Sequence, residues 1–196
     1  MNDHTQITSK SDLQDWLSYE KKRYPSFSTL AYLLQASEYA IIWKHQVLLR
    51  KTEYHINAKH GIRSIIMRFR LQKVQNRYAI HIPPNVCARG LKLMHLGPVL
   101  MNGHSRVGEN CIFHINTALV AGGTNDGVPT LGNDVVVGIG AIVLGNTYIA
   151  DGVAIGANAV VNRDVLEKNI GVAGVPAKKI SNNGRFTWNR QKHSQG

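Results

Sequence analysis

Four histidines lie in the middle of the chain, at His81, His95, His104 and His114. An imidazole titrates close to neutral pH, so each of them could take a proton from a hydroxyl group. The alternative for each is a polar side chain on an outer surface. The histidines are therefore the first candidates for acid–base chemistry.

The two cysteines, Cys87 and Cys111, are too few for a disulfide framework or for a zinc site by themselves. Neither is accompanied by the histidine and asparagine pattern that would lower the pKa of its thiol. We therefore predict two free, packed thiols, no metal site and no acyl-cysteine intermediate.

A six-residue repeat predicts the elements that position these side chains. Aliphatic or phenylalanine residues recur at this period, and the residue four positions after each is small or β-branched. Neither an α-helix nor an ordinary strand has this period, whereas a hexapeptide unit forms one short strand and a turn, and three units form one coil of a triangular prism. The apolar positions are Val107, Phe113, Leu119, Leu131, Val137, Val143, Ile149, Ile155 and Val161. On this spacing, His95 and His114 are about one 18-residue coil apart.

The first part of the chain is rich in helix formers instead. We predict helices over 11–20, over 28–51 with a break near Ser37, and over about 62–78. Pro83 and Pro84 then end the helical part. The sequence therefore predicts an α-helical region (1–78), a β-helix domain (79–177) and a basic tail (178–196).

The third predicted helix is amphipathic and basic. Its apolar residues share one face, and arginines and a lysine surround them. We expect this face to pack on the β-helix, with docking on a membrane surface as the alternative. The four apolar residues are Ile62, Ile65, Ile66 and Phe69.

The net charge is +11 at pH 7, and the excess of cations lies at the two ends of the chain. No helix-turn-helix, zinc or aromatic-stacking pattern accompanies it, so nucleic acid is not the expected partner. No apolar stretch is long enough to cross a membrane. The polar, partly acidic N-terminus predicts neither secretion nor import, and we expect a cytoplasmic protein.

From about Ala79 to Ile180 the sequence resembles the serine acetyltransferase branch of the hexapeptide acyltransferases. It is most similar to the short members associated with bacterial surface-polysaccharide synthesis. The matching segments are IHIPPNV, GLKLMHLGPVLMN, VGENCIFH, VAGGT, VVVGIGAIVLGN, AIGANAVV and AGVPAKKI. The resemblance implies a mainly β fold, a left-handed parallel β-helix with an N-terminal α-helical region, which assembles as a homotrimer.

The resemblance also implies a site. The histidine that follows the GLKLM stretch, His95, would be the general base that activates a hydroxyl toward acetyl-CoA. His114 and Asn102 would be secondary or substrate-binding groups, and Asn102 or a backbone carbonyl would orient the His95 ring. The residues expected along the coenzyme A groove between subunits are Gly123, Ile139, Gly140, Ala157, Lys178 and Lys179.

Two departures from true serine acetyltransferases bear on the acceptor. Met94 stands where those enzymes have an acidic residue, and Val128-Pro129-Thr130 stands where they have a second active-site histidine. Serine would bring two charges that are costly to bury without partners. We therefore expect a sugar hydroxyl as the acceptor, with L-serine as the enzymatic alternative and a non-catalytic scaffold or anion-binding module as the alternative of another class.

Overall fold

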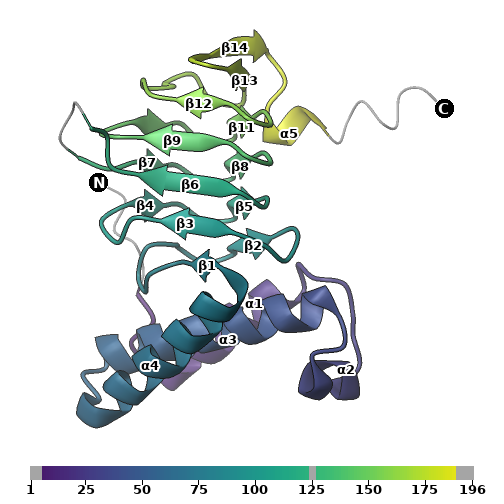
Figure 1. The fold of residues 1–196 in the computed structure, drawn as a ribbon, viewed down its shortest axis with the longest axis vertical. Coiled ribbons are helices and arrows are strands. Elements are labelled where there is room, and N and C mark those ends of the chain that lie inside the picture. Colours follow the sequence, from purple (N-terminus) through teal and green to yellow (C-terminus); the bar gives the residue numbers. More distant parts are fainter. Residues whose placement is uncertain (1–5, 124–126, 189–196) are drawn as a thin grey trace.

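The computed structural model describes residues 6–123 and 127–188. The N-terminal part is helical, and strands begin immediately after it (Figure 1). The helices are α1 (Lys10–Lys21), α2 (Thr29–Leu34), α3 (Glu38–Asn57), α4 (Gly61–Tyr78) and the short α5 (Arg185–Trp188). None of the helices in the described ranges has the length and apolarity needed to cross a bilayer.

Short strands stack into three sheets that form the faces of a triangular, left-handed parallel β-helix (Figure 1). The first face contains β1 (Ile80–His81), β3 (Val99–Met101), β6 (Thr117–Val120), β9 (Ile142–Leu144) and β12 (Val160–Val161). The second contains β4 (Arg106–Val107), β7 (Thr130–Leu131) and β10 (Tyr148–Ile149). The third contains β2 (Lys92–Leu93), β5 (Ile112–Phe113), β8 (Val136–Val137), β11 (Ala154–Ile155), β13 (Gly171–Gly174) and β14 (Ala177–Ser181). The predicted fold class is confirmed.

The register distinguishes regular coils from coils with inserted residues. Val136 pairs with Ala154, which lies 18 residues further on, as three hexapeptides require. Ile112 pairs with Val136, which lies 24 residues further on. The six extra residues are accommodated in the segment between β6 and β7, where the six-residue repeat is also broken.

The repeat predicted the interior of the prism correctly. All nine apolar positions are at most 3% exposed, and most of the small or β-branched residues four positions after them, such as Cys111, Val135 and Ala159, are buried too. Each coil therefore places two inward side chains per hexapeptide into one continuous core.

The corners depend on a second feature of the repeat. The residue three positions after an apolar position has a positive φ angle at Asn110, Asn116, Asp134 and Asn158, and at Gly140. Asparagine, aspartate and glycine tolerate this left-handed conformation better than other residues do. The chain can therefore turn sharply after each strand.

Serine side chains begin three of the helices. Ser9, Ser28 and Ser37 each accept a hydrogen bond from a backbone N–H in the first turn of α1, α2 and α3. Ser37 marks the predicted break, because it separates α2 from α3.

The prediction for the apolar face of α4 is wrong. This helix packs on α3 through Leu71 and its neighbours, and the opposite face, with Ile62 and Phe69, points away from the protein. The error arose because the sequence shows two apolar stripes on this helix, and only the one containing Leu71 is used for packing.

A buried ionic cluster joins the helices to the first coil. Arg50 donates hydrogen bonds to the carboxylates of Glu20 and Glu53 and to the carbonyls of Cys87 and Ala88. Its surroundings raise the pKa of Arg50, because the attraction of the two carboxylates outweighs the cost of burial, and burial raises the pKa of Glu53. The cluster ties α1 and α3 to the start of the β-helix.

Candidate active site

One edge of the prism carries most of the candidate residues. Four turns there lead from the strands of the third sheet to those of the first, and we call these turns the histidine corner. They comprise residues 94–98, 114–116, 138–141 and 156–159. Backbone hydrogen bonds from Gly140 to Ile115 and from Asn158 to Ile139 stack the turns in adjacent coils.

The lowest turn of the histidine corner is longer than the one above it. Leu93 pairs with Phe113 and Val99 pairs with Thr117, so five residues in the lower turn face three in the upper one. The two extra residues allow the lower turn to bulge. His95 lies in this bulge, and half of its side chain remains exposed.

A carboxylate from the helical region contacts His95. Glu38 Oε1 lies 3.3 Å from His95 Nδ1, and Glu38 Oε2 accepts a hydrogen bond from the Leu96 N–H. Glu38 therefore holds both the ring and the backbone of the bulge. This contact could not be predicted from the sequence, because Glu38 and His95 are 57 positions apart and Glu38 is marked only as the start of a helix.

The strand before His95 is fixed from the helical side by polar contacts. Tyr24 accepts a hydrogen bond from the Leu93 N–H and donates one to Gln46 of α3. Gln46 in turn donates to the carbonyl of Leu91. The position of His95 thus depends on α3 in two ways, through Gln46 beneath the strand and through Glu38 beside the ring.

His114 lies one coil above His95. Their ring centroids are 6.4 Å apart. Partial burial and, to a smaller extent, the neighbouring His95 lower the pKa of His114, which favours the neutral form of its ring. Its Nδ1 atom is buried and has no hydrogen-bond partner among residues 6–123 and 127–188.

The other predicted polar groups are not brought to this pair. Asn102 was expected to orient His95, but its side-chain oxygen accepts a hydrogen bond from the His104 N–H, and Glu38 occupies the orienting position instead. His104 is in the same exposed turn as Asn102, and His81 pairs with Leu100 on the first sheet. Asn102 is therefore a turn-forming residue.

Three of the residues expected to bind coenzyme A share the edge that carries the histidines. Ile139 and Gly140 lie in its third turn and Ala157 in its fourth. Ile139 is exposed although it is large and apolar. Gly123 lies elsewhere, after β6, next to residues outside the described ranges.

The two lysines expected near the coenzyme phosphates lie at the end of the β-helix. Lys178 pairs with Ala173 in β13, the strand above Gly156, and therefore lies near the top of the histidine corner. Lys179 is held by Glu167, with an Nζ to Oε1 distance of 2.6 Å. Only Lys178 is therefore a strong candidate for a phosphate contact.

Both cysteines are buried free thiols, as predicted. Burial raises the pKa of Cys111 to about 12, and that of Cys87 is also raised well above its ordinary value. Neither can supply a thiolate near neutral pH, so an acyl-cysteine route has no nucleophile here.

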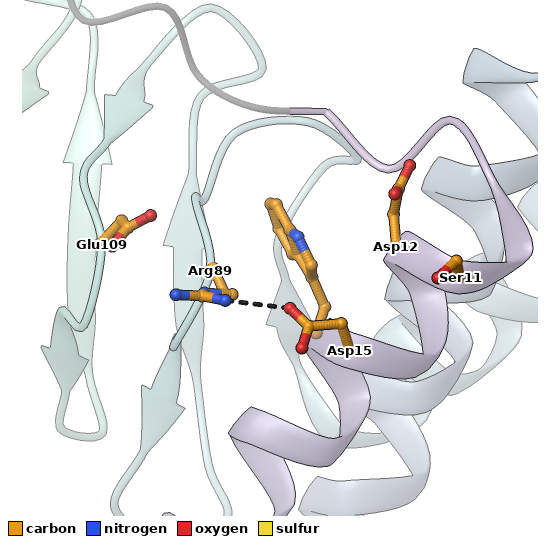
Figure 2. Close-up of a pocket in the computed structure, with 6 residues that line it drawn as sticks. Ser11, Asp12, Asp15, Arg89 and Glu109 are labelled. Carbon is orange, nitrogen blue, oxygen red and sulfur yellow. Dashed lines mark hydrogen bonds and ion pairs between the residues drawn. The ribbon is translucent and has the colours of Figure 1, made fainter.

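A hollow of about 500 Å³ lies on another side of the molecule, between α1 and the first coils (Figure 2). Its lining is charged, but Asp15 and Arg89 already form an ion pair across it. Among the described residues, its lining includes no histidine, cysteine or lysine. The histidine corner is therefore a better candidate than this hollow for a site of acyl transfer.

Comparison with protein families and known proteins agrees with the repeat. Residues 129–163 match the family model described as bacterial transferase hexapeptide (six repeats). Serine acetyltransferase of Synechococcus elongatus is 39% identical over 98 residues, which are 49% of this chain and 40% of that protein. Serine acetyltransferase of Helicobacter pylori strain J99 is 40% identical over 95 residues, 47% of this chain and 55% of that protein. The chain thus spans about half the length of the curated relatives it matches.

Solved structures share the architecture. Serine acetyltransferase from Brucella abortus in complex with coenzyme A is 26% identical, with a TM-score of 0.64 over 88% of this chain and 68% of that one. Serine acetyltransferase from Neisseria gonorrhoeae in complex with serine is 23% identical, with a TM-score of 0.66 over 88% of this chain and 71% of that one. The two sequence relatives described above are both serine acetyltransferases, and they favour that side of the resemblance over the surface-polysaccharide branch expected from the sequence.

Proposed function

We propose that this hexapeptide-repeat protein, similar to serine acetyltransferases in sequence and fold, transfers an acetyl group from acetyl-CoA to the hydroxyl of L-serine. The observation that carries the proposal is the contact between Glu38 and His95 at an edge of the β-helix that also holds His114. This arrangement has the parts of a general-base site, namely an exposed imidazole and a carboxylate that fixes its orientation.

The chemistry follows from the geometry. With Nδ1–H directed at Glu38, the His95 ring has a free lone pair on Nε2 to accept the proton of the acceptor hydroxyl. The hydroxyl oxygen attacks the thioester carbonyl carbon, and the carbon–sulfur bond then breaks. The departing thiolate takes the proton from His95, so the products are the acetyl ester and free coenzyme A, and no covalent enzyme intermediate is needed.

Two observations support serine as the acceptor. The relatives and solved structures described above are serine acetyltransferases. In addition, the expectation that Met94 leaves the site without a carboxylate is wrong, because Glu38 of α3 supplies one beside His95. A carboxylate there can pair with the ammonium group of serine as well as with the ring. Of the two serine charges that are costly to bury without partners, the positive one then has a partner.

A sugar hydroxyl is the second candidate. Its support is the sequence Val128-Pro129-Thr130, where serine acetyltransferases have a second active-site histidine. Without this histidine, the carboxylate of serine has one binding partner fewer. A neutral sugar would not need such a partner.

We also propose a homotrimer with coenzyme A held between neighbouring subunits. The outer surface of the first sheet supports this assembly, because a column of apolar side chains in register runs up it. The residues of the column are Leu100, Ala118, Ile142 and Val160. A second copy would cover this column, which lies beside the histidine corner.

Replacement of His95 by alanine tests the proposal. We expect turnover to fall by roughly 10²- to 10⁴-fold, the usual contribution of a general base, with the oligomeric mass unchanged because the side chain is half exposed. Release of thiol from acetyl-CoA with L-serine measures the rate, and His104→Ala is the matched control. An unaltered rate in His95→Ala would refute the assignment of the base.

Two further measurements separate the alternatives. A panel of L-serine, nucleotide sugars and oligosaccharides, assayed with the wild-type protein, identifies the acceptor, and turnover with a sugar but not with serine would overturn the serine assignment. Titration with coenzyme A in a calorimeter tests the scaffold alternative, since a non-catalytic scaffold should give no saturable heat.

A further inference from the structure

Helix α4 has two faces of different character. The inner face packs on α3 and on the chain beyond it, with Leu71 buried and Gln75 donating a hydrogen bond to the carbonyl of Ile82. The outer face carries four large apolar side chains at the spacing of one helical stripe, and we call them the α4 stripe. Its residues are Ile62, Ile65, Ile66 and Phe69, which are 50% to 76% exposed.

An apolar stripe of this size is unusual on an open surface. Monomeric proteins rarely expose contiguous large apolar side chains unless they bind something there. The α4 stripe contributes nothing to the core of the chain, since it points away from α3. It therefore needs a partner outside the chain.

The charges around the stripe indicate which partner. Five exposed cations lie on α4, and the helix has no carboxylate. Among the described residues, none of the five forms an ion pair. They are Arg63, Arg68, Arg70, Lys73 and Arg77. Stripe-to-stripe pairing of two copies would bring ten cations together without counter-charges, whereas an anionic surface would neutralise them.

A second exposed apolar group lies at the same end of the molecule. Helix α2 exposes Leu30, Leu33 and Leu34, each by more than 60%. Figure 1 shows α2 and the first half of α4 at the end of the molecule opposite β14. Both helices with exposed apolar side chains thus lie at the same end of the molecule.

We propose that the α4 stripe docks this protein on an anionic lipid bilayer, with the apolar side chains entering the interface and the surrounding cations contacting acidic headgroups. Such helices lie in the plane of the bilayer, apolar face inward and cationic edges toward the headgroups. The histidine corner does not take part, so this inference is independent of the proposed activity.

Sedimentation of the full-length protein with lipid vesicles tests the proposal. The wild-type protein should sediment with vesicles of phosphatidylcholine mixed with phosphatidylserine and remain in solution with phosphatidylcholine alone. Binding should weaken as salt is added, because salt screens charges near a surface. Absence of binding to the acidic vesicles would overturn the proposal.

Variants separate the apolar and the cationic contributions. Ile65→Ser with Phe69→Ser, and separately Arg63→Gln with Arg70→Gln, should each weaken binding by about tenfold or more. Leu166→Ser with Arg163→Gln is the matched control, because both side chains are exposed at the far end of the β-helix, and it should bind as the wild type does.

The oligomeric mass of the same variants distinguishes lipid binding from pairing between copies of the chain. If Ile65→Ser with Phe69→Ser lowers the mass in solution and leaves vesicle binding unchanged, the stripe joins copies of the chain and the lipid proposal fails. If vesicle binding is lost and both the mass and the melting temperature stay at wild-type values, the proposal holds.

Discussion

Glu38 is both the first residue of α3 and the partner of His95. As an acid in the first turn it favours the helix, since the positive end of the helix dipole lies there. As a hydrogen-bond acceptor it keeps the His95 ring turned so that the other nitrogen faces outward. One side chain thus couples the start of a helix to the orientation of the proposed base.

Replacement of Glu38 by glutamine should lower turnover by about 10- to 100-fold, less than loss of the base itself. The amide retains the shape of the side chain but can present its NH₂ group to the ring and stabilise the wrong tautomer. Steady-state kinetics with L-serine measures the effect, and we expect it in kcat more than in KM.

Asp12→Asn is the control for this variant, because Asp12 is an acid in the first turn of another helix, far from the histidines. It should leave turnover unchanged. If Glu38→Gln were as active as the wild type, Glu38 would have only a structural role.

At this scale the sequence predicted His95 as the candidate base and His114 as its neighbour, and the structure places the two rings one above the other. The sequence did not predict the contact of Glu38 with His95, and it assigned to Asn102 the orienting role that Glu38 has. The period of the repeat determines which residues share an edge of the prism, whereas the approach of a helix 57 residues earlier depends on tertiary packing that no local pattern encodes.

Among the elements, the turns of the histidine corner are the most constrained. Gly140 has a φ angle of +72°, and a Cβ atom at this position would collide with the side-chain oxygen of Asn158 in the next coil. The positive φ angle favours glycine, asparagine or aspartate, and the close approach of Asn158 disfavours an added Cβ atom.

Gly140→Ala should therefore lower the free energy of unfolding by roughly 1–3 kcal/mol, the usual cost of a residue held in a disfavoured conformation. Urea denaturation followed by circular dichroism measures it. Gly103→Ala is the matched control, because its φ angle is ordinary and an added Cβ would lie 3.8 Å from the ring of Pro83. A loss of equal size in both variants would contradict this account.

In the whole molecule, the junction between the helices and the β-helix rests on the buried Arg50 cluster. Its guanidinium reaches α1 through Glu20, its own helix through Glu53 and the first coil through two carbonyls. The sequence predicted the helical region and the β-helix but not this contact between them. Long charged side chains are usually exposed, and only the folded chain shows that these three meet in the interior.

Arg50→Met should cost about 3–5 kcal/mol of stability, because it leaves two buried carboxylates without a counter-charge. Arg89→Met is the matched control. Arg89 forms a partly exposed ion pair with Asp15, and pairs of that kind contribute about 0–1 kcal/mol. Denaturation in urea compares the two, and similar losses would show that the cluster does not hold the junction.

The direction of the last strand limits how these molecules can meet. β14 runs antiparallel to β13, whereas every earlier pairing in the three sheets is parallel. A second copy could not extend this sheet with another parallel strand, because the reversed strand β14 lies at one end of the β-helix and the N-terminal helices lie at the other (Figure 1). A β-helix with parallel strands at both ends could in principle add copies end to end and grow into a fibre. The reversed direction of β14 prevents this growth.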